Sequence, residues 1–192
     1  ENLRVTRYRD GTPIPTDLSN NEWENTTSGA YSIYPYEEAE GIDSEEQIVA
    51  IFGLLYNWFA VDNPTGICPE GWKVPSDDDW KILESTVGMS ESDLGIAAWR
   101  GEIASLLKSP DGWIGDSEPG TDDYGFSAKA SGARYPNGSY NRFGTYAYFW
   151  TSSPSGTQGD RGLRRLFTIN DVRINRANRP STEGQNVRCV RE

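Results

Sequence analysis

The 192-residue sequence contains no histidine, only two cysteines and a single methionine. Histidine is the side chain that most often acts as a general base near neutral pH, and it is also a common metal ligand. The sequence also lacks a glycine-rich phosphate loop, a serine-centred nucleophile elbow and the cysteine spacing of a zinc site. No catalytic constellation is therefore visible, although 29 Asp and Glu residues leave a two-carboxylate glycosidase open.

Long apolar runs and basic residues are also scarce. No run of about eighteen apolar residues occurs, so no segment is predicted to cross a membrane. The 18 Lys and Arg residues oppose 29 Asp and Glu, which gives a net charge of -11 at pH 7. Nucleic acid and anionic membrane surfaces would repel this excess negative charge. We therefore expect neither as a partner, and the oligomeric state stays open.

Aromatic, glycine and proline residues are plentiful, with seven Trp, ten Tyr, 20 Gly and 11 Pro. Such a composition favours short strands, turns and long loops over a helical bundle. The length of 192 residues fits one domain with one core. We predict a single α+β domain over residues 1–192, with two main helices, short antiparallel strands and long loops.

The chain is organised around the segment Cys68–Trp80, which combines a cysteine, two tryptophans, a turn and a helix start. Ser76 followed by Asp79 has the spacing of a capping box, and acidic residues there favour the positive end of a helix dipole. The apolar spacing that follows predicts a helix of about three turns that ends at Gly88.

A second helix is predicted upstream, where Ser44 and Gln47 are spaced as a capping box. Apolar residues then recur three and four positions apart, which predicts one continuous, strongly buried helix. These residues are Ile48, Ile51, Phe52, Leu55, Trp58 and Phe59.

The remaining pattern is mostly that of strands and turns. Strands are predicted at residues 3–8, 126–135, 146–151, 163–169, 172–175 and 186–191. Asn170-Asp171 would form a tight hairpin turn. Eight of the fourteen arginines lie within residues 161–191 and alternate with apolar residues, so we predict that they form solvent-facing sides of strands. The arginines interpreted in this way are Arg164, Arg165, Arg173 and Arg176.

A dense aromatic stretch, which begins just before the predicted turn at residues 136–138, is the best candidate for a binding surface. Strand alternation places Tyr146, Tyr148 and Trp150 on one face. Exposed flat rings stack on the C–H faces of sugars or anchor protein partners. The ligand-binding candidates are Tyr135, Tyr140, Tyr146, Tyr148 and Trp150. The alternative is that these rings fill the core.

Several motifs together are similar to those of the Fibrobacter succinogenes major paralogous domain, a family of bacterial surface and lipoprotein-type domains. The most specific is C-P-E-G-W-K-V-P-S-D-D-D-W, whose structural positions are Trp72, Ser76, Asp79 and Trp80. Matching stretches, in family order, are residues 1–15, 55–60, 125–128, 132–135, 148–153 and 187–190. The resemblance implies a C-type-lectin-like fold of the kind shared with formylglycine-generating enzymes. It implies no reaction, since the family has no assigned chemistry.

Cys68 and Cys189 form either one disulfide or two buried free thiols. The resemblance to surface proteins favours the disulfide, which would tie the last strand to the centre of the domain. It also implies export, as a lipoprotein, to the outer surface or the surroundings of a gut- or fibre-type bacterium. Because Glu1 falls on the family's domain opening, we expect an upstream signal or lipoprotein segment to be absent from this chain.

In sugar-binding C-type lectins, a long loop region holds calcium and ligand, and residues 109–124 occupy the corresponding part of this chain. The calcium-binding triplets of those lectins are missing here, but four acidic residues still offer oxygen ligands to a hard cation such as calcium. They are Asp116, Glu118, Asp122 and Asp123. The alternative is an acidic loop in solvent, and no other cofactor is expected.

These observations favour a non-catalytic extracellular or cell-surface binding module whose partner is a carbohydrate or a cell-surface protein. A structural or adhesin component of the cell envelope, without a small ligand, is the second hypothesis. An enzyme of the formylglycine-generating or glycosidase type is disfavoured. The former depends on a reactive cysteine pair, whereas the resemblance places Cys68 and Cys189 at structural positions.

Overall fold

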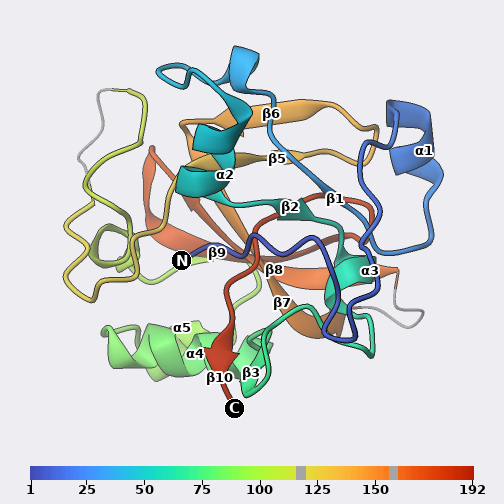
Figure 1. Ribbon diagram of the computed structural model, residues 1–192. Helices are drawn as coiled ribbons and strands as arrows, with labels where there is room; N and C mark the ends of the chain where they lie inside the picture. Colours follow the sequence, from blue (N-terminus) through green and yellow to red (C-terminus); the bar gives the residue numbers. More distant parts are fainter. Residues whose placement is uncertain (116–119, 156–159) are drawn as a thin grey trace.

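The computed structural model describes residues 1–115, 120–155 and 160–192, and within them the fold is mixed α and β, with small antiparallel sheets and few helices (Figure 1). The helices are α1 (Asn20–Asn25), α2 (Glu45–Phe52), α3 (Trp58–Val61), α4 (Asp77–Thr86) and α5 (Glu91–Leu94), with 3-10 turns at Tyr36–Glu38 and Ala104–Leu106. In the described part of the chain, no helix has the length and apolarity needed to cross a membrane.

The largest sheet runs in the order β4-β9-β8-β7 and is antiparallel throughout. Its strands are β4 (Trp99–Arg100), β7 (Tyr146–Ser155), β8 (Arg161–Thr168) and β9 (Asp171–Pro180). Thr168 pairs with Asp171, so the hairpin turn is Ile169-Asn170, one residue earlier than the Asn170-Asp171 turn predicted from the sequence.

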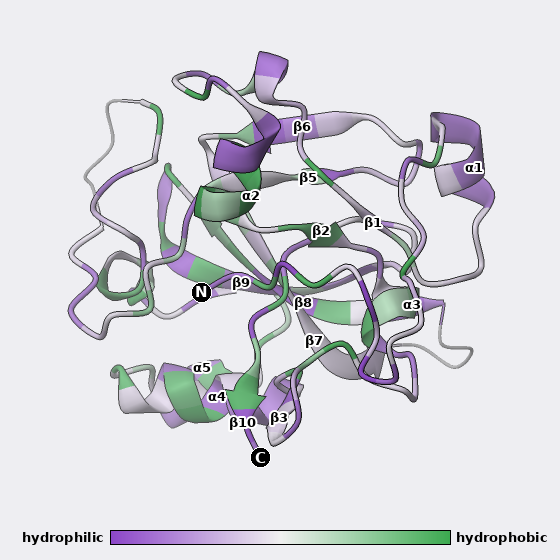
Figure 2. Cartoon of the chain, in the orientation of Figure 1, coloured by the Kyte–Doolittle hydropathy of each residue, from purple (hydrophilic) through white to green (hydrophobic). Residues whose placement is uncertain are grey.

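Three two-stranded sheets surround this sheet: β1 (Tyr31–Ser32) with β2 (Leu55–Tyr56), β3 (Trp72–Lys73) with β10 (Val190–Arg191), and β5 (Ser131–Arg134) with β6 (Tyr140–Phe143). Figure 1 shows α4, α5, β3 and β10 at one end of the molecule and α2, β5 and β6 at the other, with the large sheet between them. Hydrophobic residues gather on α2, β2 and the central strands, whereas α1 is mostly hydrophilic (Figure 2).

Helix α4 forms where the capping box predicts it. The Ser76 side chain accepts a hydrogen bond from the Asp79 amide, and the Asp79 carboxylate accepts one from the Ser76 amide at 2.8 Å. These two bonds satisfy amides that have no partner within the helix. The helix ends before Gly88, whose φ of +105° is one that glycine adopts without strain.

The upstream helix is not continuous, which corrects the prediction from the apolar spacing. Helix α2 ends at Gly53, and the chain continues through β2 before α3 begins. Gly53 has a φ of +75°, and a Cβ there would lie 2.7 Å from the Cβ of Asn2. Close packing of the first residues against this point therefore breaks the helix, so Leu55 lies in β2 and Trp58 and Phe59 belong to the separate short helix α3.

Three further strand predictions are too long, and one of them, residues 186–191, shortens to β10. Residues 3–8 form no strand; Arg7 makes an isolated bridge with Pro13, and Leu3 binds Val187 through a backbone hydrogen bond. The predicted strand at 126–135 shortens to β5, which turns at residues 136–138 into β6.

Cys68 and Cys189 form a disulfide across 121 positions of sequence, with their Cα atoms 5.9 Å apart. The bond fastens the C-terminal segment beside β3, since Val190 pairs with Lys73 in the adjoining two-stranded sheet. The prediction of a disulfide, rather than two free thiols, is confirmed.

Candidate functional site

A buried ion network fixes helix α4 to the large sheet. Glu84 and Arg165 are fully buried, and the Glu84 carboxylate accepts hydrogen bonds from Arg165 Nε and Arg100 Nη2, both at 2.6 Å. Asp77 accepts from Arg165 Nη1 at 2.8 Å and from Arg176 Nη2 at 2.7 Å. Burial alone would raise the pKa of Asp77, but the hydrogen bonds from Arg176 and Arg165 outweigh it and hold this pKa well below its usual range.

This network corrects the prediction that the arginines of the C-terminal strands face solvent. Arg164 and Arg165 are buried, with 7% and 0% exposure, and Arg176 is half-buried; Arg173 is exposed as predicted. The acidic partners come from α4, more than eighty residues earlier in the chain, so strand alternation alone gives no sign of them. We interpret this cluster as structural, because its charges pair with one another.

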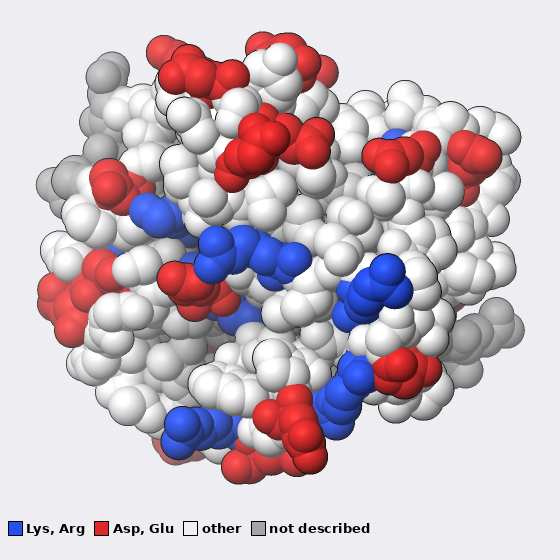
Figure 3. Space-filling view, viewed as in Figure 1, with Lys and Arg blue, Asp and Glu red and all other residues white. Residues whose placement is uncertain are grey.

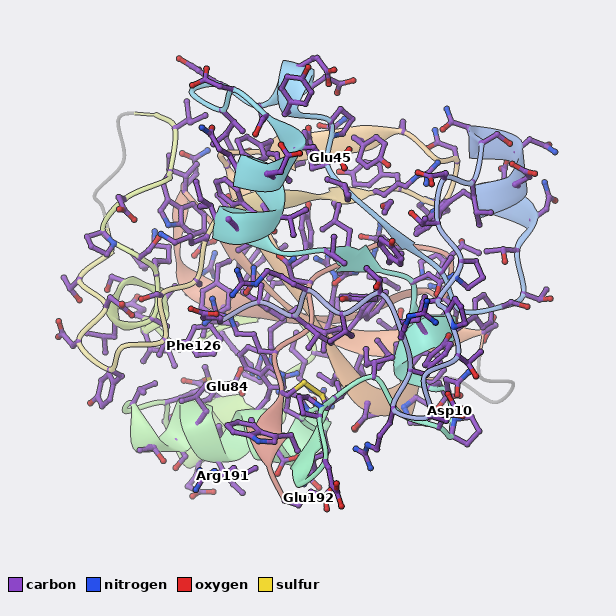
Figure 4. The ribbon with its side chains drawn as sticks, in the orientation of Figure 1. Asp10, Glu45, Glu84, Phe126, Arg191 and Glu192 are labelled. Carbon is purple, nitrogen blue, oxygen red and sulfur yellow. A yellow bond between two sulfur atoms is a disulfide. The ribbon has the colours of Figure 1, made fainter. Side chains whose placement is uncertain are left out.

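A cleft runs from the C-terminal end of α2, past the first residues of the chain, to α4 and the segment around β3. Three adjoining hollows of about 520, 330 and 420 Å³ all include Glu1 in their linings, and Phe126 and Arg188 line the first two. Trp80 and Phe126 form the apolar floor, with ring centroids 5.5 Å apart in an edge-to-face arrangement. In Figure 4, Phe126 lies on the opposite side of this cleft from α4, which carries Glu84.

Charged side chains line the 520 Å³ hollow, which Phe126 also lines. Lys129 pairs with Asp111 at 2.8 Å, and Arg4 pairs with Glu1. Figure 3 shows basic side chains gathered across the middle of this face, with acidic side chains towards both ends. Trp72 forms part of one wall and is 37% exposed. The cleft thus offers flat rings, hydrogen-bond donors and carboxylate acceptors along one path.

Arg188 holds three segments together at the base of the cleft. Its Nε donates to Asn2 Oδ1 at 2.7 Å, its Nη2 donates to Ser127 O at 2.8 Å, and its Nη1 donates to Phe126 O. The guanidinium also lies 4.3 Å from the Phe126 ring centroid. Burial lowers the pKa of Arg188 to about 10, against the opposing attraction of Asp122, so the group stays charged at neutral pH.

The predicted aromatic candidates separate into three places. Tyr146 and Tyr148 stack with ring centroids 5.8 Å apart, and Tyr135 packs beside them. Burial and the neighbouring Tyr135 raise the pKa of Tyr148 well above its usual range, and Arg164 lies 4.8 Å from the Tyr148 ring. Tyr148 is only 4% exposed, so Tyr135 and Tyr146, which are half-buried, are the rings of this group that reach the surface.

Trp150 lies elsewhere, in the core. It is fully buried, its Nε1 donates to Tyr56 O at 2.8 Å, and it packs with Trp58. Both faces of β7 are covered, so strand alternation could not say which rings are exposed. Trp150 is therefore a core residue and cannot contact a ligand at the surface, which corrects its place among the binding candidates. Tyr140, on β6, lines a separate pocket with Arg134.

The chain matches the Fibrobacter succinogenes major domain over residues 1–191. It belongs to this family. No curated protein and no solved structure matches the chain. The match spans both walls of the cleft, from the first residues to the C-terminal strand, and the family has no known function.

Within this Fibrobacter succinogenes major domain, the motif residues have structural roles that the geometry makes plain. Ser76 and Asp79 cap α4, and Trp80 packs against Phe126 and Phe149. Trp72 is the first residue of β3 and pairs with Arg191 of β10. Trp72, Asp79 and Trp80 also line the cleft, so the same segment that anchors the helix supplies one cleft wall.

The predicted cation ligands of this major domain are only partly described. Asp116 and Glu118 lie outside the described residues. The Asp122 carboxylate accepts hydrogen bonds from the Ser127 amide and hydroxyl, and Asp123 is exposed. Among the residues that the structure describes, no three His, Cys, Asp or Glu side chains are grouped as metal ligands. Calcium binding at this loop stays a prediction.

Sequence reasoning missed the cleft residues Phe126, Lys129 and Arg188. They come from a loop and from the C-terminal segment, and no local pattern links them to α4. A faint signal existed in the two family-like stretches at residues 125–128 and 187–190, which meet at Arg188.

Proposed function

We propose that this major domain is an exported, non-catalytic binding module of C-type-lectin-like fold, whose central cleft holds a glycan chain or an extended segment of a cell-surface protein. The observation that carries the proposal is the cleft itself, with its floor of Trp80 and Phe126 and its lining of Arg4, Lys129 and Arg188. Concave sites with apolar floors and a few convergent polar groups are the usual form of ligand sites.

The chemistry of the cleft suits such a ligand. Aromatic rings pack against the apolar faces of sugars or against peptide side chains, and neighbouring polar groups fix the orientation. Trp72, as an exposed ring on the wall, can close over a bound chain without refolding of the core. The three adjoining hollows form an elongated groove rather than one compact pocket, and this shape favours an extended ligand over a compact one.

Export to the outer surface of a bacterium, as a lipoprotein, is part of the same proposal. The disulfide between Cys68 and Cys189 supports it, because structural disulfides form and persist mainly in oxidising compartments. The non-catalytic assignment draws support from the lack of histidine and from the engagement of Asp77 and Glu84 in ion pairs.

Retention on insoluble polysaccharides, together with a glycan array and binding to intact bacterial cells, tests the proposal. The informative variant is Trp72→Ala, and Ile82→Ala, which removes another exposed side chain outside the cleft, is the matched control. We expect the wild type and Ile82→Ala to bind equally and Trp72→Ala to bind at least about tenfold more weakly at unchanged melting temperature, since one lost ring contact is worth more than about 1.4 kcal/mol.

Equal binding by Trp72→Ala and the wild type would remove the cleft from the binding surface. Failure to bind any glycan or cell surface, combined with self-association, would favour the structural role in the cell envelope.

A further inference from the structure

A second pocket, of about 260 Å³, lies between the residues before α1, strand β1, the start of α2 and the β5-β6 hairpin. It shares no lining residue with the central cleft. Pockets for drug-sized ligands are roughly 300–1,000 Å³, so this one suits something smaller, of the size of a single sugar ring. Figure 4 places Glu45 at the start of α2, on the side of the molecule that carries β6, and Glu45 lines this pocket.

Arg134 is the fixed centre of the pocket. It is 4% exposed, its Nε donates to Gly138 O at 3.0 Å, and its Nη2 donates to Leu18 O at 2.7 Å. The guanidinium lies 4.3 Å from the Trp23 ring centroid and 5.2 Å from that of Tyr140. Two rings and two backbone carbonyls therefore hold the cation in one orientation before any ligand arrives.

The ion pairs of the described residues do not include Arg134. A buried cation usually has a carboxylate partner, and Arg100 and Arg165, which are buried beneath α4, each have one. The carboxylates that line this pocket, Asp17 and Glu45, are exposed at its mouth.

Ser32 supplies an independent sign of a ligand. It lines the pocket, is 3% exposed, and its Oγ is buried without a hydrogen-bond partner in the described structure. A buried hydroxyl without a partner is costly, and such groups call for an explanation. Asp17, also in the lining, has a φ of +58°, a backbone conformation that is uncommon outside glycine and often found at functional positions.

We propose that the Arg134–Tyr140 pocket binds one neutral pyranose ring, at a site separate from the central cleft. A sugar hydroxyl is both a donor and an acceptor, so it can accept from Arg134, bond to Ser32 and donate to Asp17 or Glu45. One cation and two carboxylates in the lining disfavour an anionic ligand, whereas the half-buried Tyr140 ring offers a wall for the C–H face of a sugar. The proposal depends on none of the cleft residues.

Protein-observed NMR titrations of the ¹⁵N-labelled chain with the methyl glycosides of glucose, galactose, mannose and xylose test it, with methyl glucuronide as the anionic comparison. The variants are Ser32→Ala and Glu45→Ala, and Glu46→Ala is the matched control because Glu46 is the adjacent exposed carboxylate and does not line the pocket. The Arg134 Nε–H resonance reports occupation of the pocket directly.

We expect saturable binding of at least one neutral glycoside with a shift of the Arg134 resonance. The affinity should fall about tenfold in Ser32→Ala and in Glu45→Ala, and it should change less than about twofold in Glu46→Ala and in the cleft variant Trp72→Ala.

Three results would overturn the proposal. They are saturable binding of the glucuronide alone, equal affinity in Ser32→Ala, Glu45→Ala and the wild type, and no saturable binding of any of the four neutral glycosides. Since Trp72→Ala affects the cleft alone, failure at this pocket and failure of the proposed function are distinguishable.

Discussion

Replacing Glu84 by glutamine tests whether the buried ion network holds α4 to the large sheet. The carboxylate accepts from Arg165 Nε and Arg100 Nη2 at 2.6 Å and from Arg165 Nη2 at 3.2 Å, in a fully buried position. Glutamine keeps the shape but removes the negative charge, which leaves Arg100 buried beside no carboxylate. Breaking a buried pair in this way costs about 3–5 kcal/mol.

This loss is a large part of a typical folding free energy of about 5–15 kcal/mol. For a chain of this length it corresponds to a fall in melting temperature of about 6–20 °C. Guanidinium unfolding with the disulfide intact, followed by tryptophan fluorescence, measures the free energy, and calorimetry measures the melting temperature.

The double variant Glu84→Gln/Arg100→Met supplies the control. Glu84→Gln leaves the Arg100 charge buried without a partner. Because the double variant also removes this charge, we expect it to be more stable than Glu84→Gln alone. A cost below about 1 kcal/mol for Glu84→Gln, the range of surface ion pairs, would refute the assignment of this network as the anchor of α4.

Two further predictions follow from the same structure. Replacing Cys68 and Cys189 by serine should destabilise the fold by about 4–5 kcal/mol, because the bond closes a loop across 121 positions; unfolding curves within about 1 kcal/mol of the wild type would contradict this. The pKa of Asp77 is depressed in the folded state by Arg176 and Arg165 despite burial, so its contribution to stability is full above the unfolded pKa of about 3.9 and is lost as the pH falls towards the lower folded value. Denaturation midpoints measured from pH 7 to about pH 2 should therefore fall more steeply below about pH 4 for the wild type than for Asp77→Asn, and parallel curves would exclude this role.

The sequence predicted best the features that are encoded locally. Helix α4 is specified by Ser76 and Asp79, whose side chains bond the amides of the same turn, so no distant residue is needed to place its start. The upstream helix failed for the opposite reason. Its apolar spacing continues past Gly53, but the chain turns there because Asn2 and Leu3 pack against that glycine from the far end of the sequence.

The candidate sites show the same division more strongly. The alternation of residue types correctly predicted that Arg165 lies on a strand, but it wrongly predicted that the side chain faces solvent. The acidic partners Asp77 and Glu84 are 88 and 81 residues away in the sequence, so the local pattern does not reveal them. The dense aromatic stretch predicted that Tyr140 and Trp150 belong to one binding surface, whereas in the structure Tyr140 lines a pocket and Trp150 lies in the core. The tertiary packing over each face of a strand determines which aromatic rings remain exposed to a ligand.

The most direct test of the binding cleft is a two-dimensional NMR titration of the wild-type chain with the polysaccharide or cell-surface protein that it retains. We predict shifts of the Trp72 and Trp80 indole N–H resonances and of the amides at residues 125–127, 129 and 188–190, all of which line the cleft. Saturable shifts confined to residues outside the cleft, with both indole resonances unmoved, would contradict the account.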